Sequence, residues 1–375
     1  MADVLIYADT MRSPELRHEV PVAVPDPFLY VEQNGTKHAV LTSFEVDRVR
    51  EAGIEAHPLE EFGWDELVGQ GPREQQLLTL WERAAEGLGV KEAIVPSTFP
   101  LELADRLRAN GIEVRPDPLF FAKRRRAKNE AELAGIRKAQ RGTEAAMDAA
   151  RDLFRRAEPA NGQLEVDGET LTSELVKGAI TDVFNRHGLV SDEMIAAHGA
   201  QAAIGHDMGS GPIASGEPIV LDLFPRDRDS GCYADMTRTF VIGEPPDELV
   251  EYHRLVKEAL DRAIAAIKPG EGGRVIYELV CDVFHEAGYP TQLSKKEGEV
   301  LDRGFYHGLG HGVGLEVHEA PWLSRDPGTI EVGDVITIEP GLYRPGFGGC
   351  RLEDLVLVTE DGAENLTQYP YDLTP

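Results

Sequence analysis

The stretch Glu217–Phe240 has the sequence EPIVLDLFPRDRDSGCYADMTRTF, and the stretch Gly333–Val358 has the sequence GDVITIEPGLYRPGFGGCRLEDLVLV. Each contains short apolar runs bounded by proline and glycine, a pattern typical of buried strands. A carboxylate within a buried strand is costly unless it is paired or binds a cation. Four carboxylates cannot neutralise one another, so the pattern predicts one or two divalent cations. The four are Asp222 and Asp235 in the first stretch and Glu339 and Glu353 in the second.

A histidine-rich segment, FYHGLGHGVGLEVHEAP at Phe305–Pro321, lies between the two acidic stretches. Its glycines allow a close approach of the backbone to other groups. His311 is flanked by Gly310 and Gly312 and is therefore the best candidate for an imidazole ligand. Other histidines in glycine-rich segments would then be available to donate protons or to bind a substrate. These are His206, His307 and His318.

The remaining histidines carry less information. His198 precedes Gly199, and its role stays open. The other histidines lie in expected helices or loops without acidic partners, so we predict that they are structural. These are His18, His38, His57, His187, His253 and His285.

Arg351 and Glu353 are two residues apart in an otherwise apolar segment, GCRLEDLVLV. Alternation along a strand places such residues on the same face, as it does for Asp235 and Thr237. We therefore predict that Arg351 hydrogen-bonds a ligating carboxylate and orients it. The alternative is an Arg–Glu pair at the surface, which the apolar neighbours do not favour.

The chain of 375 residues is long enough for two domains. Residues 1–122 alternate short apolar runs with amphipathic helices and carry no catalytic constellation, which predicts an accessory α/β domain. Residues 123–375 are predicted to form the catalytic domain. The expected strands of the first domain are Val4–Tyr7, Phe28–Val31, Ala39–Leu41 and Ala93–Val95, and the expected helices are Glu45–Glu51, Arg73–Leu88 and Leu101–Asn110.

In residues 123–375 the order helix, helix, strand, strand occurs twice, and the acidic pairs are separated by 13 and 14 residues. This repeated order and spacing predict an α/β (α+β) fold of two similar halves that face each other across one site. A polar loop is expected at Gly162–Gly168. The basic run Lys123–Lys128 is interpreted as a domain junction and the start of a long helix rather than a nucleic-acid patch. The expected helices are Asn129–Arg156, Leu171–His187 (capped by Thr170 or Thr172), Glu248–Ile267 and Val275–Ala287.

The composition excludes several classes of partner. With 66 acidic and 38 basic residues the net charge is −28, which argues against nucleic acids and anionic membranes. The same acid excess predicts a halophilic protein that stays soluble in high salt. Three isolated cysteines give no disulfide framework, and no signal peptide or run of 18 apolar residues is visible, which predicts a reducing cytoplasm.

The motifs HGLGHGVGLEVHEAP, TIEPGLY and GGCRLED are similar to those of the metallopeptidase family M24. That family includes methionine aminopeptidase, aminopeptidase P and prolidase. Residues 129–375 resemble its "pita-bread" catalytic domain, and the preceding domain makes the aminopeptidase P and prolidase branch the closer match. The resemblance implies five metal ligands, three histidines on the substrate side and one arginine behind the ligands. The implied metal ligands are Asp222, Asp235, His311, Glu339 and Glu353. The implied substrate-side histidines are His206, His307 and His318, and the implied arginine is Arg351.

The resemblance also implies an activity, which is hydrolysis of the Xaa-Pro bond of peptides with a free N-terminus. A hydroxide that bridges two divalent ions would attack the scissile carbonyl. Glu339 is expected to carry the proton, while His307 and His318 polarise the carbonyl or steady the oxyanion. The ligand set suits Mn²⁺ first, with Co²⁺ or Zn²⁺ also suitable. Because the family commonly dimerises, we expect a homodimer.

Two alternatives share the same fold. A methionine aminopeptidase-like enzyme would not be expected to carry the N-terminal domain. A non-catalytic binding protein would tend to have lost ligands, and all five are present. No GxSxG, HExxH or GxxxxGK[ST] motif occurs, so serine hydrolases, zincins and P-loop proteins lack support.

The sequence departs from the family pattern in two places. The segment DLFPRDRDSG, which begins at Asp222, is longer and bulkier than is usual for the family. Trp322 directly follows the motif HEAP, where prolidases often carry an arginine that holds the carboxylate of a dipeptide. We therefore expect Trp322 to contact the substrate and Xaa-Pro-Yaa peptides to be preferred over Xaa-Pro dipeptides.

Overall fold

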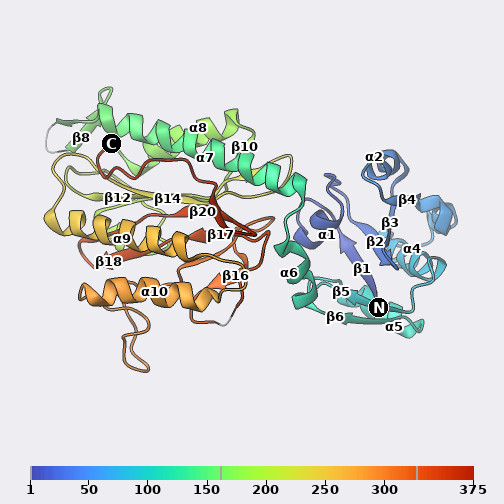
Figure 1. Cartoon of the computed structure of the whole chain (residues 1–375). Helices are drawn as coiled ribbons and strands as arrows, with labels where there is room; N and C mark the ends of the chain where they lie inside the picture. The colour runs from blue at the N-terminus through green and yellow to red at the C-terminus, as the bar shows by residue number, and fades with distance from the viewer. Residues whose placement is uncertain (1, 161–162, 327) are drawn as a thin grey trace. The chain divides into compact units, whose positions relative to one another are not determined.

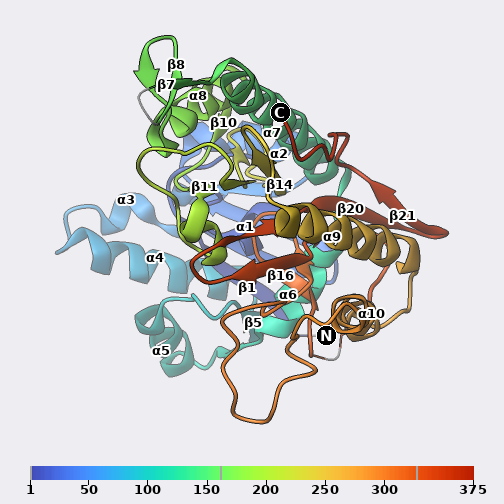
Figure 2. The ribbon, with the colours of Figure 1, turned by 90° about the vertical axis from the view of Figure 1, so that its left-hand side faces the viewer.

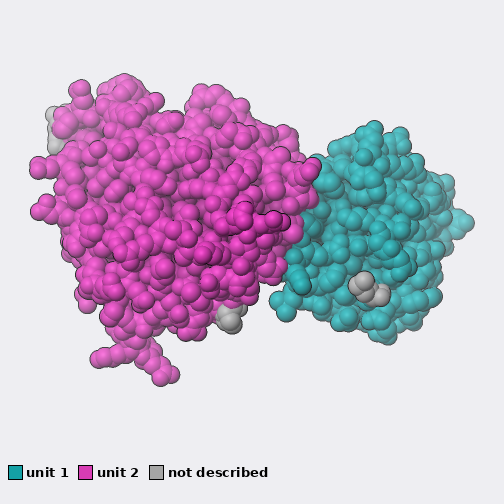
Figure 3. Space-filling view, viewed as in Figure 1, with its two compact units in different colours: residues 1–125 teal, residues 126–375 magenta. Residues whose placement is uncertain are grey.

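The computed structural model describes residues 2–160, 163–326 and 328–375. The chain divides into two compact units, Met1–Arg125 and Arg126–Pro375 (Figure 3). The division falls inside the basic run Lys123–Lys128. The accessory role of the first unit stays a prediction. In the part of the chain that is described, no helix combines the length and the apolar character needed to cross a membrane.

The first unit contains a six-stranded sheet with the order β4-β3-β2-β1-β5-β6 (Figure 1). Two apolar clusters pack on the sheet, one around Trp81 and Leu103 and the other around Phe28 and Phe121. The strands are β1 (Asp3–Ala8), β2 (Phe28–Gln33), β3 (Thr36–Leu41), β4 (Glu55–Pro58), β5 (Glu92–Val95) and β6 (Glu113–Pro116). The helices are α1 (Pro14–Glu19), α2 (Val46–Glu51), α3 (Trp64–Leu67), α4 (Arg73–Gly87), α5 (Leu101–Ala109) and α6 (Pro118–Arg126).

The four strands and three helices expected in this unit are confirmed, with ends that differ by one to three residues. The two edge strands β4 and β6 were not predicted. Their sequences, EAHP and EVRP, each have a single buried residue, Ala56 and Val114. Edge strands are often short and polar because this discourages pairing with other chains. The apolar alternation that reveals inner strands is therefore missing.

The long helix expected at Asn129–Arg156 is confirmed as α7 (Glu130–Arg156), with Asn129 as its N-cap. The basic run Lys123–Lys128 lies before this helix and contains the end of α6. The Asn129 side chain accepts from the backbone of Glu132, and the Glu132 side chain accepts from the backbone of Asn129. This capping box satisfies amide groups that the first turn of a helix leaves unpaired.

The second unit consists of two halves, each with two helices over a sheet. In the first half, α7 and α8 (Ser173–Arg186) pack on the sheet β11-β12-β14. In the second half, α9 (Asp247–Ala266) and α10 (Gly273–Glu286) pack on the sheet β16-β15-β17-β20-β21. Figure 2 shows these four helices in an arc outside the strands. The predicted repeat of helix, helix, strand, strand is thus confirmed, and Thr172 caps α8.

The strands of the second unit are mostly short. Those of the first half are β10 (Leu189–Val190), β11 (Ile195–His198), β12 (Pro218–Leu223), β13 (Arg226–Asp227) and β14 (Met236–Val241). Those of the second half are β15 (Gly310–Gly312), β16 (Glu319–Leu323), β17 (Val335–Ile338), β18 (Gly341–Arg344), β19 (Gly348–Arg351), β20 (Asp354–Thr359) and β21 (Gly362–Asn365).

The polar loop expected at Gly162–Gly168 is wrong over its described part. Gly162 lies outside the described residues, and the rest belongs to a small sheet of β7 (Glu158–Ala160), β8 (Gln163–Val166) and β9 (Glu169–Thr170). Asp167 and Gly168 both have positive φ, 54° and 84°. Asp-Gly is a favoured pair for a two-residue hairpin turn, so the sequence did carry the signal.

Candidate metal centre

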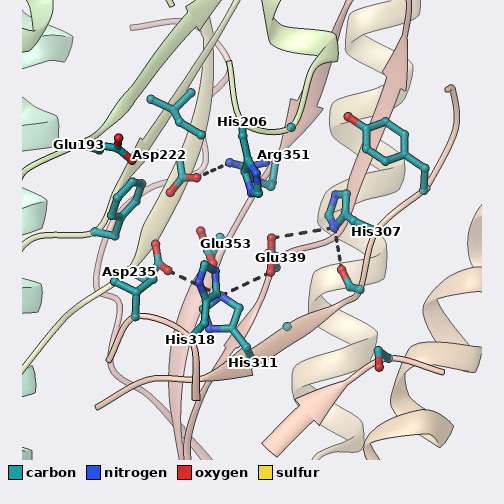
Figure 4. Close-up of a pocket in the computed structure, with 18 of the residues that line it drawn as sticks. Glu193, His206, Asp222, Asp235, His307, His311, His318, Glu339, Arg351 and Glu353 are labelled. Carbon is teal, nitrogen blue, oxygen red and sulfur yellow. Dashed lines mark hydrogen bonds and ion pairs between the residues drawn. The ribbon is translucent and has the colours of Figure 1, made fainter. Parts of the chain in front are cut away.

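The two halves of the second unit bring the five predicted ligands to one cavity of about 1020 Å³ (Figure 4). His311 lies on β15, the strand between β16 and β17. A Cβ atom on Gly310 would lie 2.0 Å from the carbonyl oxygen of Thr337, and one on Gly312 would lie 2.3 Å from that of Ala320. The prediction that glycines allow close backbone approach around His311 is confirmed.

His311 presents a defined nitrogen to the acidic residues. Its Nδ1 donates to the carbonyl oxygen of Gly312 at 3.1 Å. Its Nε2 lies 3.6 Å from Oε1 of Glu339 and 3.8 Å from Oδ2 of Asp235. Such a bond at the far nitrogen fixes the tautomer and leaves Nε2 available as a ligand.

The four acidic residues reach the cavity mainly from strand ends, which corrects the expectation that all lie within strands. Only Asp222 lies inside one, β12. Asp235 immediately precedes β14 and Glu339 immediately follows β17. Glu353 lies between β19, which pairs with β18, and β20, which pairs with β17. The segment GCRLEDLVLV is thus two strands with different partners, and periodicity could not reveal the change.

The pKa values of three of these carboxylates are raised, as expected where buried acidic groups lie close together without a bound cation. Burial and the charge of Glu353 raise the pKa of Asp235 well above its ordinary value. Burial, followed by the charge of Glu339, does the same for the pKa of Glu353, and burial raises the pKa of Glu339 to about 7. Burial lowers the pKa of His311 to about 3, so the ring is neutral and able to bind a metal at neutral pH.

The residues fit divalent metal ions. Ligand atoms of Asp235, His311 and Glu353 all lie within 4.8 Å of one another, and all three residues are buried. Oδ1 of Asp222 and Oδ1 of Asp235 are buried and have no hydrogen-bond partner in the described chain. A buried, unpartnered carboxylate oxygen is costly unless a cation binds it. Four carboxylates and one imidazole are also ligands that suit Mn²⁺, Co²⁺ or Zn²⁺.

Arg351 connects two of the carboxylates, and it is 5% exposed. Its Nη2 donates to Oδ2 of Asp222. Its Nε donates to Oγ1 of Thr237 at 3.1 Å, and that hydroxyl donates to Oε2 of Glu353 at 2.7 Å. Arg351 therefore contacts Asp222 directly and Glu353 through Thr237. The contact with a carboxylate was expected, but the reason given for it was wrong, because Arg351 ends β19 and Glu353 lies between β19 and β20.

The three substrate-side histidines all line the cavity. His206 and His318 are exposed to it. The His318 ring meets the His311 ring edge-on at 4.3 Å between centroids and is nearly parallel to the ring of Trp322 at 6.4 Å. Trp322, on β16, is 47% exposed, so its indole face is free for contact with a bound molecule.

His307 is more constrained. Its Nδ1 donates to the carbonyl oxygen of Gly308 at 2.7 Å, and its Nε2 lies 2.9 Å from the hydroxyl of Tyr343. Its Nδ1 also lies 4.0 Å from Oε2 of Glu339. Burial and the charge of Arg351 lower the pKa of His307 to about 3. The ring is therefore neutral at physiological pH.

Tyr343 was not identified from the sequence, although it joins His307 to Arg351. Nη1 of Arg351 donates to its hydroxyl at 3.3 Å. Two glycines make room for its ring: a Cβ atom on Gly341 would lie 2.4 Å from the hydroxyl, and one on Gly349 would lie 2.3 Å from Cδ1. The sequence feature that could have identified Tyr343 is an aromatic residue between two glycines, Gly341 and Gly349, of one hairpin.

His198 is structural. Its Nδ1 lies 2.9 Å from Oε2 of Glu217, and its Nε2 donates to the carbonyl oxygen of Ser210 at 3.1 Å. Both ring nitrogens therefore have partners in the protein.

The longer segment after Asp222 forms a compact turn. Its strand β13 pairs with β10. The Asp227 carboxylate accepts from the backbone and hydroxyl of Ser230 at 2.9 and 2.7 Å and pairs with Lys138 at 2.6 Å. Burial opposes the shift, but the bonds from Lys138 and Ser230 lower the pKa of Asp227. The additional residues are thus held against α7.

Comparison with known proteins identifies the family. Residues 134–360 match metallopeptidase family M24. This chain belongs to that family. M24 membership indicates divalent metal ions as cofactors and a peptide as substrate, in agreement with the ligands in the cavity.

Curated relatives include two proteins named Xaa-Pro dipeptidase. The chain is 39% identical to the Xaa-Pro dipeptidase of Pyrococcus furiosus over 183 residues, which cover 48% of this chain and 49% of that protein. It is 32% identical to the Xaa-Pro dipeptidase of Pyrococcus horikoshii over 291 residues, which cover 76% and 75%. The first of these matches therefore spans about half the length of the relative.

Solved structures of M24 proteins match nearly the whole chain. The X-Pro aminopeptidase of Thermotoga maritima superimposes with a TM-score of 0.80 at 22% identity and covers 99% of this chain and 97% of its own. The prolidase of Pyrococcus horikoshii gives a TM-score of 0.76 at 25% identity and covers 100% and 95%. The pita-bread fold with a preceding α/β domain is confirmed.

Proposed function

We propose that this M24 chain is a metal-dependent exopeptidase that hydrolyses the Xaa-Pro bond at the N-terminus of peptides. The observation that carries the proposal is the convergence of four carboxylates and one imidazole in a single buried site. The similarity to proteins named Xaa-Pro dipeptidase, prolidase and X-Pro aminopeptidase supports the choice of bond. The five ligands are Asp222, Asp235, His311, Glu339 and Glu353.

The chemistry follows from the residues of the cavity. Divalent ions, when bound, activate a water molecule and polarise the scissile carbonyl group. Glu339 would accept a proton at its carboxylate and deliver it to the leaving proline nitrogen. His318 and His206, exposed to the cavity, can donate hydrogen bonds to the carbonyl oxygen as negative charge develops there. Tyr343 and Gly308 hold the ring of His307 in the cavity wall.

Recognition of the free N-terminus is assigned to the acidic end of the cavity. Glu193 lines this cavity together with Asp222 and Asp235 (Figure 4). A protonated amine at this end would meet negative charge. Trp322, beside His311 and His318, offers an indole face to the residues that follow the scissile bond, which supports the preference for Xaa-Pro-Yaa peptides.

The finer properties belong to the same proposal. Mn²⁺ is the preferred ion, with Co²⁺ and Zn²⁺ as alternatives, because hard carboxylate oxygens outnumber the single imidazole. We infer a homodimer in a reducing cytoplasm of high ionic strength. Residues 1–122 serve as an accessory domain, and residues 123–375 carry the activity.

A metal-reconstitution assay tests the proposal. The chelator-treated protein is reloaded with Mn²⁺, Co²⁺ or Zn²⁺ and offered Xaa-Pro dipeptides, Xaa-Pro-Yaa peptides and Met-Ala peptides. We expect hydrolysis of Xaa-Pro bonds, with the highest kcat/KM for Xaa-Pro-Yaa. Cleavage of Met-Ala peptides alone would instead identify a methionine aminopeptidase. Absence of all hydrolysis in every metal-loaded form would identify a binding protein.

A further inference from the structure

The first unit contains a cluster of two histidines and a glutamate at one edge of its sheet. His38 lies on β3, and Glu55 and His57 lie on the edge strand β4. The parallel register pairs His38 with Glu55 and Val40 with His57. Residues two apart on a strand share a face, so all three side chains project from the same side of the sheet. The expectation that His38 and His57 lack acidic partners is therefore wrong.

The ligand atoms of the cluster have the spacing of a metal site. Nδ1 of His38 lies 3.2 Å from Nε2 of His57 and 3.3 Å from Oε2 of Glu55. The three atoms all lie within 4.8 Å of one another. Bonds of about 2.0–2.1 Å in a tetrahedral site place neighbouring ligand atoms about 3.3–3.4 Å apart. Two of the distances thus already match the edges of such a tetrahedron.

A fourth residue orients one of the two rings. Nδ1 of His57 donates to Oε2 of Glu61 at 2.9 Å. Glu61 lies on the 3₁₀ turn Leu59–Phe62, which directly follows β4, and the ring of Phe62 meets the His57 ring edge-on at 6.0 Å. A carboxylate behind a histidine holds the tautomer with a lone pair on the opposite nitrogen. Nε2 of His57 is therefore the nitrogen presented to His38 and Glu55.

The cluster is accessible from solvent. The side chains of His38 and Glu55 are 15% and 64% exposed, and that of His57 is 23% exposed, so an ion has a path from solvent.

We propose that His38, Glu55 and His57 bind one divalent transition metal ion of the zinc class, at a site separate from the catalytic centre. Two imidazole nitrogens and one carboxylate oxygen suit Zn²⁺ better than Mg²⁺ or Ca²⁺, which prefer oxygen ligands. The fourth position stays open to water or to another ligand. The ion ties the edge strand β4 to β3. The site uses only residues of the first unit and shares none with the cavity of the second.

The test uses the full chain with the catalytic centre disabled by Asp235→Asn and Glu353→Gln, which remove two of its ligand charges. Zn²⁺ is titrated in competition with a chromophoric chelator, and bound zinc is counted after desalting. We expect one equivalent of Zn²⁺ per chain. His57→Gln or His38→Gln added to this background should weaken binding at least about 100-fold, and Glu61→Gln about 10–100-fold. His285→Gln, at an exposed histidine of the second unit, is the matched control.

Thermal unfolding gives a second readout. Zn²⁺ should raise the Tm of the disabled chain, because a ligand that binds only the folded state stabilises it. The increase should disappear with His38→Gln or Glu55→Gln, both at accessible positions, and circular dichroism verifies that each variant is folded. No zinc bound to the disabled chain, or zinc that remains in His38→Gln/His57→Gln, overturns the proposal. Xaa-Pro hydrolysis by the wild type is measured separately, so failure of this site and failure of the proposed function are distinguishable.

Discussion

Thr237 and Glu353 are joined by two hydrogen bonds across the two halves of the second unit. The backbone amide of Glu353 donates to the carbonyl oxygen of Thr237 at 3.0 Å, and the Thr237 hydroxyl donates to Oε2 of Glu353 at 2.7 Å. The same hydroxyl accepts from Nε of Arg351 at 3.1 Å. A residue that binds no metal in our assignment therefore fixes a proposed ligand of the opposite half.

Thr237→Val removes this hydroxyl while keeping the branched shape. It leaves Oε2 of Glu353 and Nε of Arg351 without their partner, at a cost of about 1–3 kcal/mol in the free energy of unfolding. We expect metal affinity to fall about 10–100-fold, the usual effect of losing a bond to a ligand. Chelator competition measures the affinity. Thr181→Val, at an exposed helical threonine, serves as control, and equal metal affinity in the two variants would contradict the assignment.

Asp235→Asn tests the proposed set of metal ligands directly. The variant loses a charge that should bind the ion, so we expect lower metal occupancy and a kcat/KM reduced at least about 100-fold. The metal-free variant should in contrast be more stable than the metal-free wild type, because a buried carboxylate facing Glu353 and Asp222 has been neutralised. Elemental analysis and thermal unfolding in chelator check the two effects. Full occupancy together with full activity would rule out Asp235 as a ligand.

The pKa of Glu339 predicts a pH dependence of the metal-free protein. Burial raises this pKa from 4.5 to about 7, so the folded state holds a proton that the unfolded state releases between these values. Stability from this group is therefore complete below about pH 4.5 and is lost as the pH rises to about 7. At about 1.4 kcal/mol per pKa unit, the loss amounts to about 3 kcal/mol at most.

Glu339→Gln isolates this effect, because His307 and His311 have lowered pKa values and change stability in the opposite direction below pH 6.5. We expect the unfolding free energy of the wild type to fall relative to that of Glu339→Gln across this pH range in chelator. Denaturant unfolding at several pH values measures the difference. A constant difference would show that Glu339 is already ionised.

Trp322→Arg should alter the choice between dipeptides and longer peptides. With Trp322 in place of an arginine, a carboxylate directly after proline would lose that charged partner, and a hydrogen bond to a charged group contributes about 1.5–3 kcal/mol. We expect the variant to shift the ratio of kcat/KM toward Xaa-Pro, whereas Trp322→Phe, which keeps an aromatic face, should not. A wild type that prefers dipeptides, with an unchanged ratio in Trp322→Arg, would leave Trp322 with a packing role only.

Salt should stabilise the whole chain. A net charge of −28 produces self-repulsion in the compact state that ions screen. We expect the Tm to rise when KCl increases from about 0.1 M to about 3 M, a range over which the Debye length falls from about 10 Å to below 3 Å. Sucrose at matched water activity, which does not screen charge, is the control. A flat or falling Tm in KCl would remove the halophilic interpretation.

The candidate site residues of the second unit were easier to predict from the sequence than those of the first unit. Acidic residues beside apolar runs indicated the proposed metal ligands, because a buried carboxylate is costly unless it is neutralised. The pairing partners of strands were not visible, which is why the break between Arg351 and Glu353 was missed. The cluster of His38, Glu55 and His57 was missed for the same reason. Glu55 and His57 lie on a short polar strand, and only the parallel register with β3 brings His38 beside them.

The turn after Asp222 has a practical consequence for protein engineering. Its ends are closed by the bond between the Asp227 amide and the Cys232 carbonyl, at 2.8 Å, and its Asp227 carboxylate is fixed to Lys138. The side chain of Asp229, at the tip, is 86% exposed. Exposure alone would make this tip a tempting place to insert a peptide epitope or a fluorescent reporter. An insertion after Arg228 would, however, separate Asp227 from Ser230, whose backbone and hydroxyl its carboxylate binds. The turn is therefore a poor insertion site, because its internal bonds hold the connection between two proposed ligands, Asp222 and Asp235.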